Sequence, residues 1–207
     1  MDPKKHWETI YQTKAPDTVS WYRPHLEKSL DLILKAVNHD SKAAIIDVGA
    51  GEATLVDDLL DRGFQNITVL DISKKAIKDT KQRLGSKASA VTWMIEDITR
   101  VELAAQYFDV WHDRAVFHFL TDPADREAYV KRVAQSVKTG GHVIVATFGP
   151  EGPEKCSGLN VVRYDAESLH DQFGARFKLV EHTSEEHETP FGTTQQFLYC
   201  YCKVEAI

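Results

Sequence analysis

The stretch Ile45-Ile46-Asp47-Val48-Gly49-Ala50-Gly51-Glu52-Ala53 decides the fold of this chain. It joins an apolar run, residues 43–48, to a helix-like segment, residues 53–62, through two glycines. The pattern predicts a strand, a tight turn and a helix. The first glycine allows the turn, and the second lets the backbone approach a ligand with no Cβ in the way. The N-terminus of the helix then offers N–H groups that have no partner within the helix.

A second apolar run, residues 66–70, ends at Asp71. An acid in this position of a strand–helix–strand unit usually binds ribose hydroxyls. Further apolar runs predict strands at 91–95, 108–112 and 142–148, and Gly140-Gly141 is expected to turn the chain into the last of these. Helical spacing predicts helices over residues 24–37, 73–84, 123–138 and 165–173, with a long loop over 149–159.

The final two runs, residues 177–181 and 195–204, have no helix between them and are expected to pair antiparallel. Regular alternation of strand and helix before them predicts a parallel sheet with helices on both faces. The predicted fold class is therefore α/β: a doubly wound, mostly parallel, seven-stranded sheet with an antiparallel last strand.

Composition limits the class of partner. The 207 residues are 43% hydrophobic and 27% charged, which suits one α/β domain with a full core. The net charge of −6 gives no basic stripe, so we expect no nucleic-acid partner. No apolar run approaches the ~20 residues that span a bilayer, so we expect no membrane partner. Three cysteines, an odd number, favour a reducing, cytoplasmic location. The oligomeric state is left open.

The N-terminal segment is rich in aromatic and polar residues: Trp7, Tyr11, Trp21 and Tyr22. Trp7 and Tyr11 lie four residues apart, on one face of a helix. Two interpretations stay open. The segment is a lid whose rings face a cationic ligand, or it is an arm packed on the edge of the sheet.

Acids follow four successive strands, at Asp47, Asp71, Asp97 and Asp113. In a doubly wound sheet, ligands bind beyond the carboxyl ends of the strands, where the strand order reverses. We therefore expect these side chains, with the segment up to His118, to surround one ligand. Turns and helix caps also favour acids, which accounts for some of the four.

These residues resemble the class I, seven-stranded S-adenosylmethionine-dependent methyltransferases. Residues 47–53 are similar to the first motif of that family, although Ala53 stands where many relatives have glycine. Val69-Leu70-Asp71-Ile72-Ser73 resembles the second-strand motif, and Glu96-Asp97-Ile98 the segment that meets adenine. The antiparallel last strand separates this reading from nicotinamide oxidoreductases. Residues 1–40 then form an N-terminal lid and helix, and residues 41–207 the core of a single methyltransferase domain.

The resemblance implies roles for the cofactor-binding residues. Asp71 would accept from the ribose hydroxyls and Asp97 from the adenine amino group, with Ile72 and Ile98 on the ring faces or simply in the core. Asp47 would order the glycine turn or meet the methionine amino group through water. The predicted cofactor contacts are Trp7, Tyr11, Trp21, Asp47, Gly49, Ala50, Gly51, Asp71, Ile72, Asp97, Ile98 and Asp113.

The acceptor end is less defined. His118 is read as a general base or as a polar residue on a helix face, and Asp113 as its catalytic companion. Arg114 would pair with an anionic substrate or with a local acid. Arg163 and Tyr164 would reach the substrate or form a strand-edge pair. The predicted substrate contacts are Trp21, Tyr22, Arg114, His118, Arg163 and Tyr164.

No metal site is predicted, because the single loop cysteine Cys156, the alternating Cys200 and Cys202, and the nine histidines do not show ligand spacing. The sequence favours transfer of a methyl group from S-adenosylmethionine to a small-molecule acceptor such as a thiol, metalloid, amine or carboxylate, which releases S-adenosylhomocysteine. The aromatic lid supports a closed pocket. Alternatives are a protein-lysine methyltransferase, since Asp113-Arg114-Ala115-Val116 resembles the Asp-Lys-Gly-Thr pattern of some of them, and a non-catalytic S-adenosylmethionine-binding protein.

Overall fold

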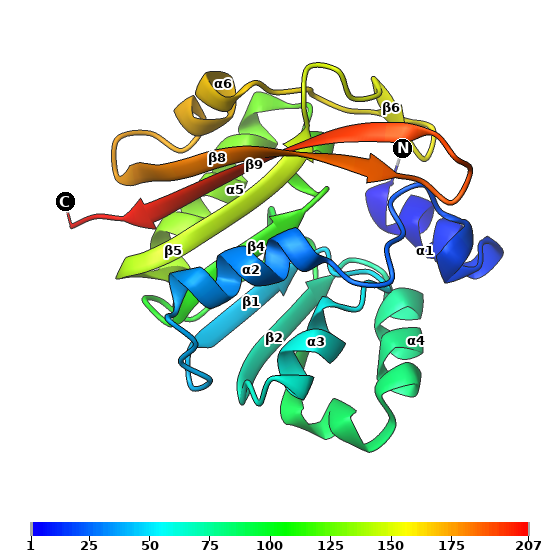
Figure 1. The fold of residues 1–207 in the computed structure, drawn as a ribbon, viewed down its shortest axis with the longest axis horizontal. Coiled ribbons are helices and arrows are strands. Elements are labelled where there is room, and N and C mark those ends of the chain that lie inside the picture. The colour runs from blue at the N-terminus through cyan, green and yellow to red at the C-terminus, as the bar shows by residue number, and fades with distance from the viewer. Residues whose placement is uncertain (1, 207) are drawn as a thin grey trace.

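One sheet forms the centre of the molecule, with the strand order β3-β2-β1-β4-β5-β9-β8 (Figure 1). The computed structural model describes residues 2–206. The strands are β1 (Ala44–Val48), β2 (Asn66–Asp71), β3 (Val91–Ile95), β4 (Phe108–Arg114), β5 (Val137–Phe148), β8 (Phe177–Glu188) and β9 (Thr194–Val204). Strand β9 runs antiparallel to β5 and β8, and the pairings among the first five strands are parallel. The seven-stranded, mostly parallel sheet with an antiparallel last strand confirms the predicted fold class.

Helices cover both faces of this sheet. They are α1 (Pro3–Thr13), α2 (Glu27–Ala36), α3 (Leu55–Asp61), α4 (Lys74–Leu84), α5 (Pro123–Ser136) and α6 (Ala166–Asp171). One buried cluster joins α2, α3 and α4 to one face, and a second joins α5 and α6 to the other. Figure 1 shows α2 and α3 in front of the sheet and α5 behind it.

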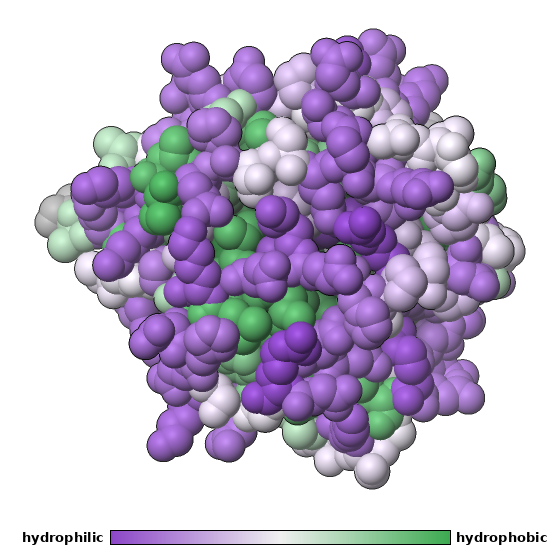
Figure 2. Space-filling model, viewed as in Figure 1, coloured by the Kyte–Doolittle hydropathy of each residue, from purple (hydrophilic) through white to green (hydrophobic). Residues whose placement is uncertain are grey.

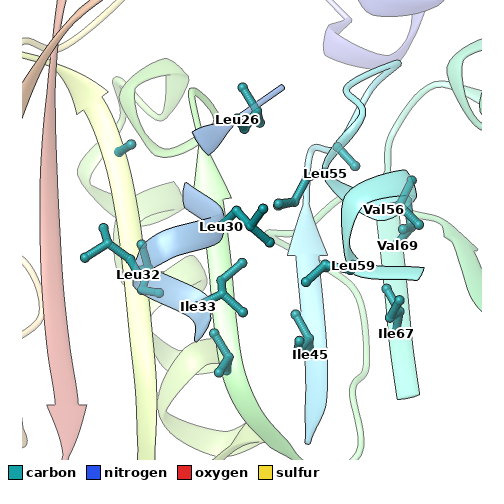
Figure 3. Packing of buried hydrophobic residues seen from close by; sticks show 14 of the residues in the cluster. Leu26, Leu30, Leu32, Ile33, Ile45, Leu55, Val56, Leu59, Ile67 and Val69 are labelled. Atoms are coloured by element: carbon teal, nitrogen blue, oxygen red, sulfur yellow. The ribbon is translucent and has the colours of Figure 1, made fainter. Parts of the chain in front are cut away.

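Aliphatic packing holds the first face together. In Figure 3, Leu30 and Ile33 of α2 and Leu59 of α3 lie over Ile45 of β1 and Ile67 of β2. All five side chains are at least 96% shielded from solvent. Truncating one such residue to Ala costs about 2–5 kcal/mol. This packing fixes where the carboxyl ends of β1 and β2 stand.

The helix predicted over residues 24–37 begins later, at Glu27. Its first hydrogen bond runs from Leu30 N to the carbonyl of Leu26, and no side chain caps this end. The Pro24 carbonyl accepts instead from the Thr54 hydroxyl at 2.6 Å. Pro24 therefore belongs to a connection that ties the chain before α2 to the turn before α3.

The turn predicted at Gly140-Gly141 is wrong in its detail, because both residues lie inside β5. Helix α5 ends at Ser136 and the strand begins at once. Phe108 pairs with Val137 while Val110 pairs with His142, so β5 carries extra residues in a bulge. Gly140 has φ +84°, which glycine adopts without steric cost.

The loop predicted over residues 149–159 contains a small hairpin, β6 (Lys155–Cys156) and β7 (Leu159–Asn160). Ser157 and Gly158 form its two-residue turn, both with positive φ, as tight hairpins of this kind require. Strand β8 is also longer than predicted, since it pairs with β9 through Glu188.

The N-terminal segment is attached to the rest of the molecule on two sides. On one side, the Glu8 carboxylate of α1 accepts from the Ser73 hydroxyl at 2.8 Å and from the Lys75 N–H at 3.1 Å, at the start of α4. On the other side, Arg23 pairs with Glu185 of β8 at 2.5 Å. The segment therefore bridges α4 and the β8–β9 hairpin, as the position of α1 in Figure 1 indicates.

The face of the molecule seen in Figure 2 is mostly hydrophilic, with hydrophobic side chains in separate small areas. Within residues 2–206, none of the helices combines the length and the apolar character that crossing a bilayer requires.

We predict that Glu8→Ala loosens α1 without unfolding the protein. The change removes two hydrogen bonds to a carboxylate, so amide hydrogen exchange in residues 3–13 is expected to speed up roughly tenfold or more. Asp17→Asn, at an exposed carboxyl of the same segment, serves as control and is expected to leave exchange unchanged. Equal exchange rates in Glu8→Ala and wild type would contradict the anchoring role.

Candidate active site

A cavity of about 520 Å³ opens at the carboxyl ends of β1, β2 and β4, beneath α1 and residues 16–23. Its volume falls within the range of about 300–1,000 Å³ typical of small-molecule sites. The predicted site residues that line it are Trp7, Tyr11, Trp21, Tyr22, Asp47, Gly49, Ala50, Asp71, Ile72, Asp97, Ile98 and Arg114. Five other predicted residues do not line it: Gly51, Asp113, His118, Arg163 and Tyr164.

The Asp71 carboxylate, at the end of β2, orders the part of the cavity that lies beside the glycine turn. One oxygen accepts from the Gly51 N–H at 2.8 Å and the other from the Ser73 N–H at 2.7 Å. Each carboxylate oxygen has a second acceptor site, so Asp71 retains capacity for two further donors. Burial raises the pKa of Asp71 to about 6, against the two backbone hydrogen bonds, which lower it.

Protein side chains lie close to both glycines of the turn. A Cβ on Gly49 would lie 1.9 Å from a methyl carbon of Val116. A Cβ on Gly51 would lie 2.3 Å from the Tyr11 hydroxyl oxygen. Gly51 thus makes room for the N-terminal helix. The Tyr11 side chain of that helix covers the glycine turn, which was predicted to approach a ligand.

A second acid on this side of the cavity, Glu52, follows the glycine turn directly. Burial, with the neighbouring Asp79 carboxyl, raises the pKa of Glu52 to about 7. Asp97 lies at the far end, where its carboxylate accepts from the Thr99 N–H at 2.9 Å and hydroxyl at 2.7 Å. Ile98 beside it is buried and Ile72 is half-buried.

His112 is a cavity residue that sequence reasoning missed. Its Nδ1 lies 2.7 Å from Asp47 Oδ1, and both side chains are buried. A carboxylate only accepts, so Nδ1 donates, and Nε2 is a buried nitrogen without a partner among the described residues. Asp47 and His112 are paired in register on β1 and β4, so only knowledge of the strand order would have revealed the contact.

The structure contradicts the predicted contact between His118 and an acceptor. His118 is fully buried, and its Nδ1 accepts from the Phe148 N–H at 3.2 Å. Burial, with a smaller effect from Arg114, lowers the pKa of His118 to about 3. The ring stays neutral and joins β5 to the turn after β4, so it is not placed to take a proton from a ligand.

Asp113 is also a structural acid rather than a residue of the cavity wall. Its carboxylate accepts from the Tyr129 hydroxyl at 2.7 Å and from the N–H groups of Val116 and Phe117 at 2.8 and 3.1 Å. Burial raises its pKa to about 6. Asp113 therefore orders the turn after β4, on which Arg114 and Val116 face the cavity.

The two residues predicted after the loop lie elsewhere too. Arg163 donates to the carbonyls of Pro150 and Gly152 at 3.0 and 3.2 Å, which braces the loop. Tyr164 is buried in the core cluster on the α5 side. The cavity wall on this side comes instead from the hairpin, through Cys156, Leu159 and Asn160.

Aromatic rings close the acceptor end of the cavity. The Trp7 ring lies 5.0 Å from Phe119 and 5.9 Å from Trp21 between centroids, both edge to face. The Arg114 guanidinium lies 4.0 Å from the centre of the Phe197 ring and forms the floor. Among residues 2–206, no group of three or more His, Cys, Asp or Glu side chains is arranged to hold a metal ion.

Sequence comparison finds that the chain is similar to methyltransferases. Residues 45–141 match the model of a methyltransferase domain. A zebrafish protein, EEF1A lysine methyltransferase 2, is 30% identical over 147 residues, which cover 67% of this chain and 63% of that protein. The mouse eEF1A lysine and N-terminal methyltransferase is 29% identical over 140 residues. That match covers 67% of this chain but only 19% of the mouse protein.

Solved structures share the fold at low sequence identity. The N-methyltransferase NodS from Bradyrhizobium japonicum, in complex with S-adenosyl-L-homocysteine, superposes with a TM-score of 0.74 at 14% identity, covering 97% of this chain and all of that one. A structure that concerns the conversion of a disulfide bond into a thioacetal group during echinomycin biosynthesis gives a TM-score of 0.77 at 14% identity, covering 98% of this chain and 93% of that one. These likenesses show that the chain has the fold of the class I S-adenosylmethionine-dependent methyltransferases, and residues 45–141 match a methyltransferase domain.

Proposed function

We propose that this chain transfers a methyl group from S-adenosylmethionine to a small-molecule acceptor held beneath its aromatic lid. One observation carries the proposal: the cavity that begins at Asp71 and the glycine turn continues under Trp7 and Trp21, which cover it. A covered cavity of this volume leaves room for a compact acceptor beside the cofactor. The relatives described above are named as lysine methyltransferases that act on a protein, so the small acceptor is inferred from the cavity and not from the relatives.

The residues present fit the cofactor. Asp71 keeps free acceptor capacity at the position where a nucleoside presents two hydroxyl donors. Asp97 and Ile98 line the cavity where an adenine ring would need an acceptor and an apolar surface. Asp47 and Glu52 add acidic groups beside the glycine turn, which suit the ammonium and sulfonium charges of this ligand.

The cofactor supplies an activated methyl group on a sulfonium, and the protein has to position the acceptor and exclude water. Trp7, Trp21 and Phe119 exclude water from the acceptor end. A general base is required only for an acceptor that arrives protonated. His112 lines the cavity and its Nε2 atom is unpartnered among the described residues, whereas His118 does not line the cavity.

A protein-lysine methyltransferase of the same fold is the second candidate, and the names of the relatives favour it. The charges at the acceptor end oppose it, because both Arg23 and Arg114 line the cavity there. A lysine ammonium would enter a covered space next to two cations. A protein that binds S-adenosylmethionine without turnover is the third candidate and differs only in releasing no product.

The first prediction concerns the acceptor. We expect purified protein to release S-adenosylhomocysteine with one or more small thiols, selenols, amines or carboxylates, and not with lysine-containing peptides or with eEF1A. Coupled detection of S-adenosylhomocysteine across such a panel is the measurement. Release with peptides or eEF1A alone would reject the small-molecule acceptor. Cofactor binding without release from any acceptor would favour the binding protein.

The second prediction concerns pH. The Asp71 carboxylate accepts hydroxyl donors only when it is deprotonated, and its pKa in the free protein is about 6. Affinity for S-adenosylmethionine is therefore expected to be greatest near pH 8, to decline modestly as Glu52, with a pKa of about 7, takes up a proton, and to fall most steeply below pH 6, by roughly up to tenfold per pH unit. Calorimetric titration from pH 5 to pH 8 measures this.

Asp71→Asn is the matched variant for that titration. Losing a pair of charge-assisted hydrogen bonds should weaken cofactor binding at pH 8 by about tenfold or more. The fall below pH 6 should shrink, because the titrating carboxyl has gone. Unchanged affinity in Asp71→Asn, or an unchanged fall at low pH, would remove Asp71 from the cofactor site.

The third prediction concerns the lid. Trp7→Ala opens the contact with Trp21 and Phe119 and admits water above the cavity. The Michaelis constant for S-adenosylmethionine is expected to rise several-fold, since part of the covering surface is lost. Tyr107→Ala, at an exposed aromatic residue far from the lid, is the control. An unchanged Michaelis constant in Trp7→Ala would show that α1 is an arm and not a lid.

A further inference from the structure

We infer that the methyl acceptor of this cavity is a thiol, and that it reacts as the thiolate without a base from the protein. The inference rests on the proposed function and narrows it to one chemical class of acceptor. Three features of the acceptor end support it. They are a positive charge that presents no open hydrogen-bonding edge, walls of aromatic and aliphatic side chains, and predicted acid–base residues that lie outside the cavity.

The acceptor end carries an excess of positive charge. Arg114 ends β4, Arg23 lies in the N-terminal segment, and both line the cavity. The acid beside them is Glu185, whose carboxylate lies 2.5 Å from Arg23 Nη1 and 3.8 Å from Arg114 Nη2. Burial lowers the pKa of the neighbouring His187, and the charge of Arg114 lowers it further, so this ring is neutral near pH 7. Two guanidinium groups therefore share one carboxylate, and this end attracts an anion and repels a cation.

The buried guanidinium supplies charge but not hydrogen bonds. The Arg114 side chain is only 5% exposed, and its Nη1 donates to the Trp21 carbonyl at 3.3 Å. Its Nε and Nη2 atoms are shielded from the cavity, so no ligand reaches them. A carboxylate acceptor would therefore lose its hydration without gaining these donors in exchange. A thiolate is larger, more polarisable and a weaker hydrogen-bond acceptor, so it loses less and keeps the long-range attraction.

Apolar side chains form the walls of this end. The Trp7 ring lies 5.0 Å from Phe119 and 5.9 Å from Trp21, and the buried side chains of Val19 and Leu26 also line the cavity. Such walls exclude water, so charges between them interact strongly. A thiolate and a sulfonium become two uncharged sulfur atoms when the methyl group is transferred, which a water-poor space favours. An amine would instead end as a cation beside two arginines.

The transfer itself requires no proton acceptor. The thiolate sulfur attacks the methyl carbon in line and forms the new sulfur–carbon bond. The bond from that carbon to the sulfonium sulfur breaks, and its electron pair stays on the sulfur of S-adenosylhomocysteine. No proton moves in this step, so no general base is needed. This agrees with the positions of Asp113 and His118, the predicted catalytic residues, which do not line the cavity.

The thiol of the cavity wall indicates which thiols qualify. Cys156 lines the cavity, and burial raises the pKa of its thiol to about 11, although Arg114 acts in the opposite direction. This end therefore does not ionise a buried thiol by itself, and an acceptor has to enter already ionised. Thiols more acidic than cysteine meet this condition near neutral pH. Aromatic thiols are of this kind, and their rings match the aromatic walls.

The first test compares acceptors that share a ring and differ in the reacting group: thiophenol, phenol, aniline and benzoate. Release of S-adenosylhomocysteine is measured for each at the same concentration and at pH 8. We expect release with thiophenol to be about tenfold or more faster than with the other three.

The second test asks where the proton goes. The value of kcat/KM is measured from pH 6.5 to pH 10, at saturating S-adenosylmethionine, for 4-nitrothiophenol, thiophenol and phenylmethanethiol, which are successively weaker acids. We expect the pH of half-maximal kcat/KM to rise along this series with the pKa of each thiol. A base on the cavity wall, at His6 or His112, would instead hold it at one pH for all three.

The third test measures binding without turnover. Protein loaded with S-adenosylhomocysteine carries no sulfonium, so binding of the coloured 4-nitrothiophenol anion, followed by its absorbance, reports on the charges of the chain itself. Glu185→Gln is expected to tighten this binding several-fold and Arg114→Gln to weaken it. Arg114→Lys should retain it, because only the charge is used. Glu181→Gln is the control, since this residue lies on the same strand, pairs with Lys35 and does not line the cavity.

The outcomes separate this inference from the proposed function. Release with phenol, aniline or benzoate that equals or exceeds release with thiophenol rejects the thiol and leaves the proposed function intact. One common pH of half-maximal kcat/KM rejects the reaction without a base. Weaker binding in both Glu185→Gln and Arg114→Lys rejects the role of the charge, and this pair decides if Arg114→Gln does not fold. Release with lysine peptides alone, or with no acceptor, rejects the inference together with the proposed function.

Discussion

The pair of hydrogen bonds that Asp71 accepts holds the site together. Parallel pairing of β1 with β2 places the end of one strand beside the end of the other, so a single carboxylate reaches both the Gly51 N–H and the Ser73 N–H. The first bond fixes the glycine turn and the second fixes the start of α4. Because these donors occupy only one acceptor site on each oxygen, the acid that builds the turn also remains able to bind a ligand.

The glycine turn and the start of α4 also determine where the N-terminal lid lies. Ser73 caps α4 through its own hydroxyl, which accepts from Ala76 N–H, and donates to Glu8 of α1. Gly51 has no side chain, so the Tyr11 hydroxyl comes down onto the turn. At its other end the N-terminal segment is held by Arg23, which pairs with Glu185 of β8. The antiparallel hairpin that closes the sheet therefore helps to hold the N-terminal segment over the cavity, although its sequence carries no motif.

The sequence predicted those features that depend on neighbouring residues in the chain. Strand ends, the glycine turn, Asp71 and Asp97 follow from apolar runs and from the positions just after them, and the structure brings them to one cavity. Such local patterns could not predict contacts between strands that are far apart in the sequence. Asp47 meets His112 only because β1 and β4 are neighbours, and His118 turns into the core because Phe148 needs an acceptor for its N–H. The bulge at Gly140 depends likewise on pairing with β4.

Charge divides the cavity into two halves that respond differently to pH. The acids near the glycine turn are partly desolvated, which raises the pKa of Asp71 to about 6 and that of Glu52 to about 7, so this half loses negative charge as the pH falls toward 6. Arg114 stays protonated throughout, since arginine does not titrate in this range. The attraction of the acidic half for a cationic cofactor therefore weakens as the pH falls, while the charge at the arginine end does not change.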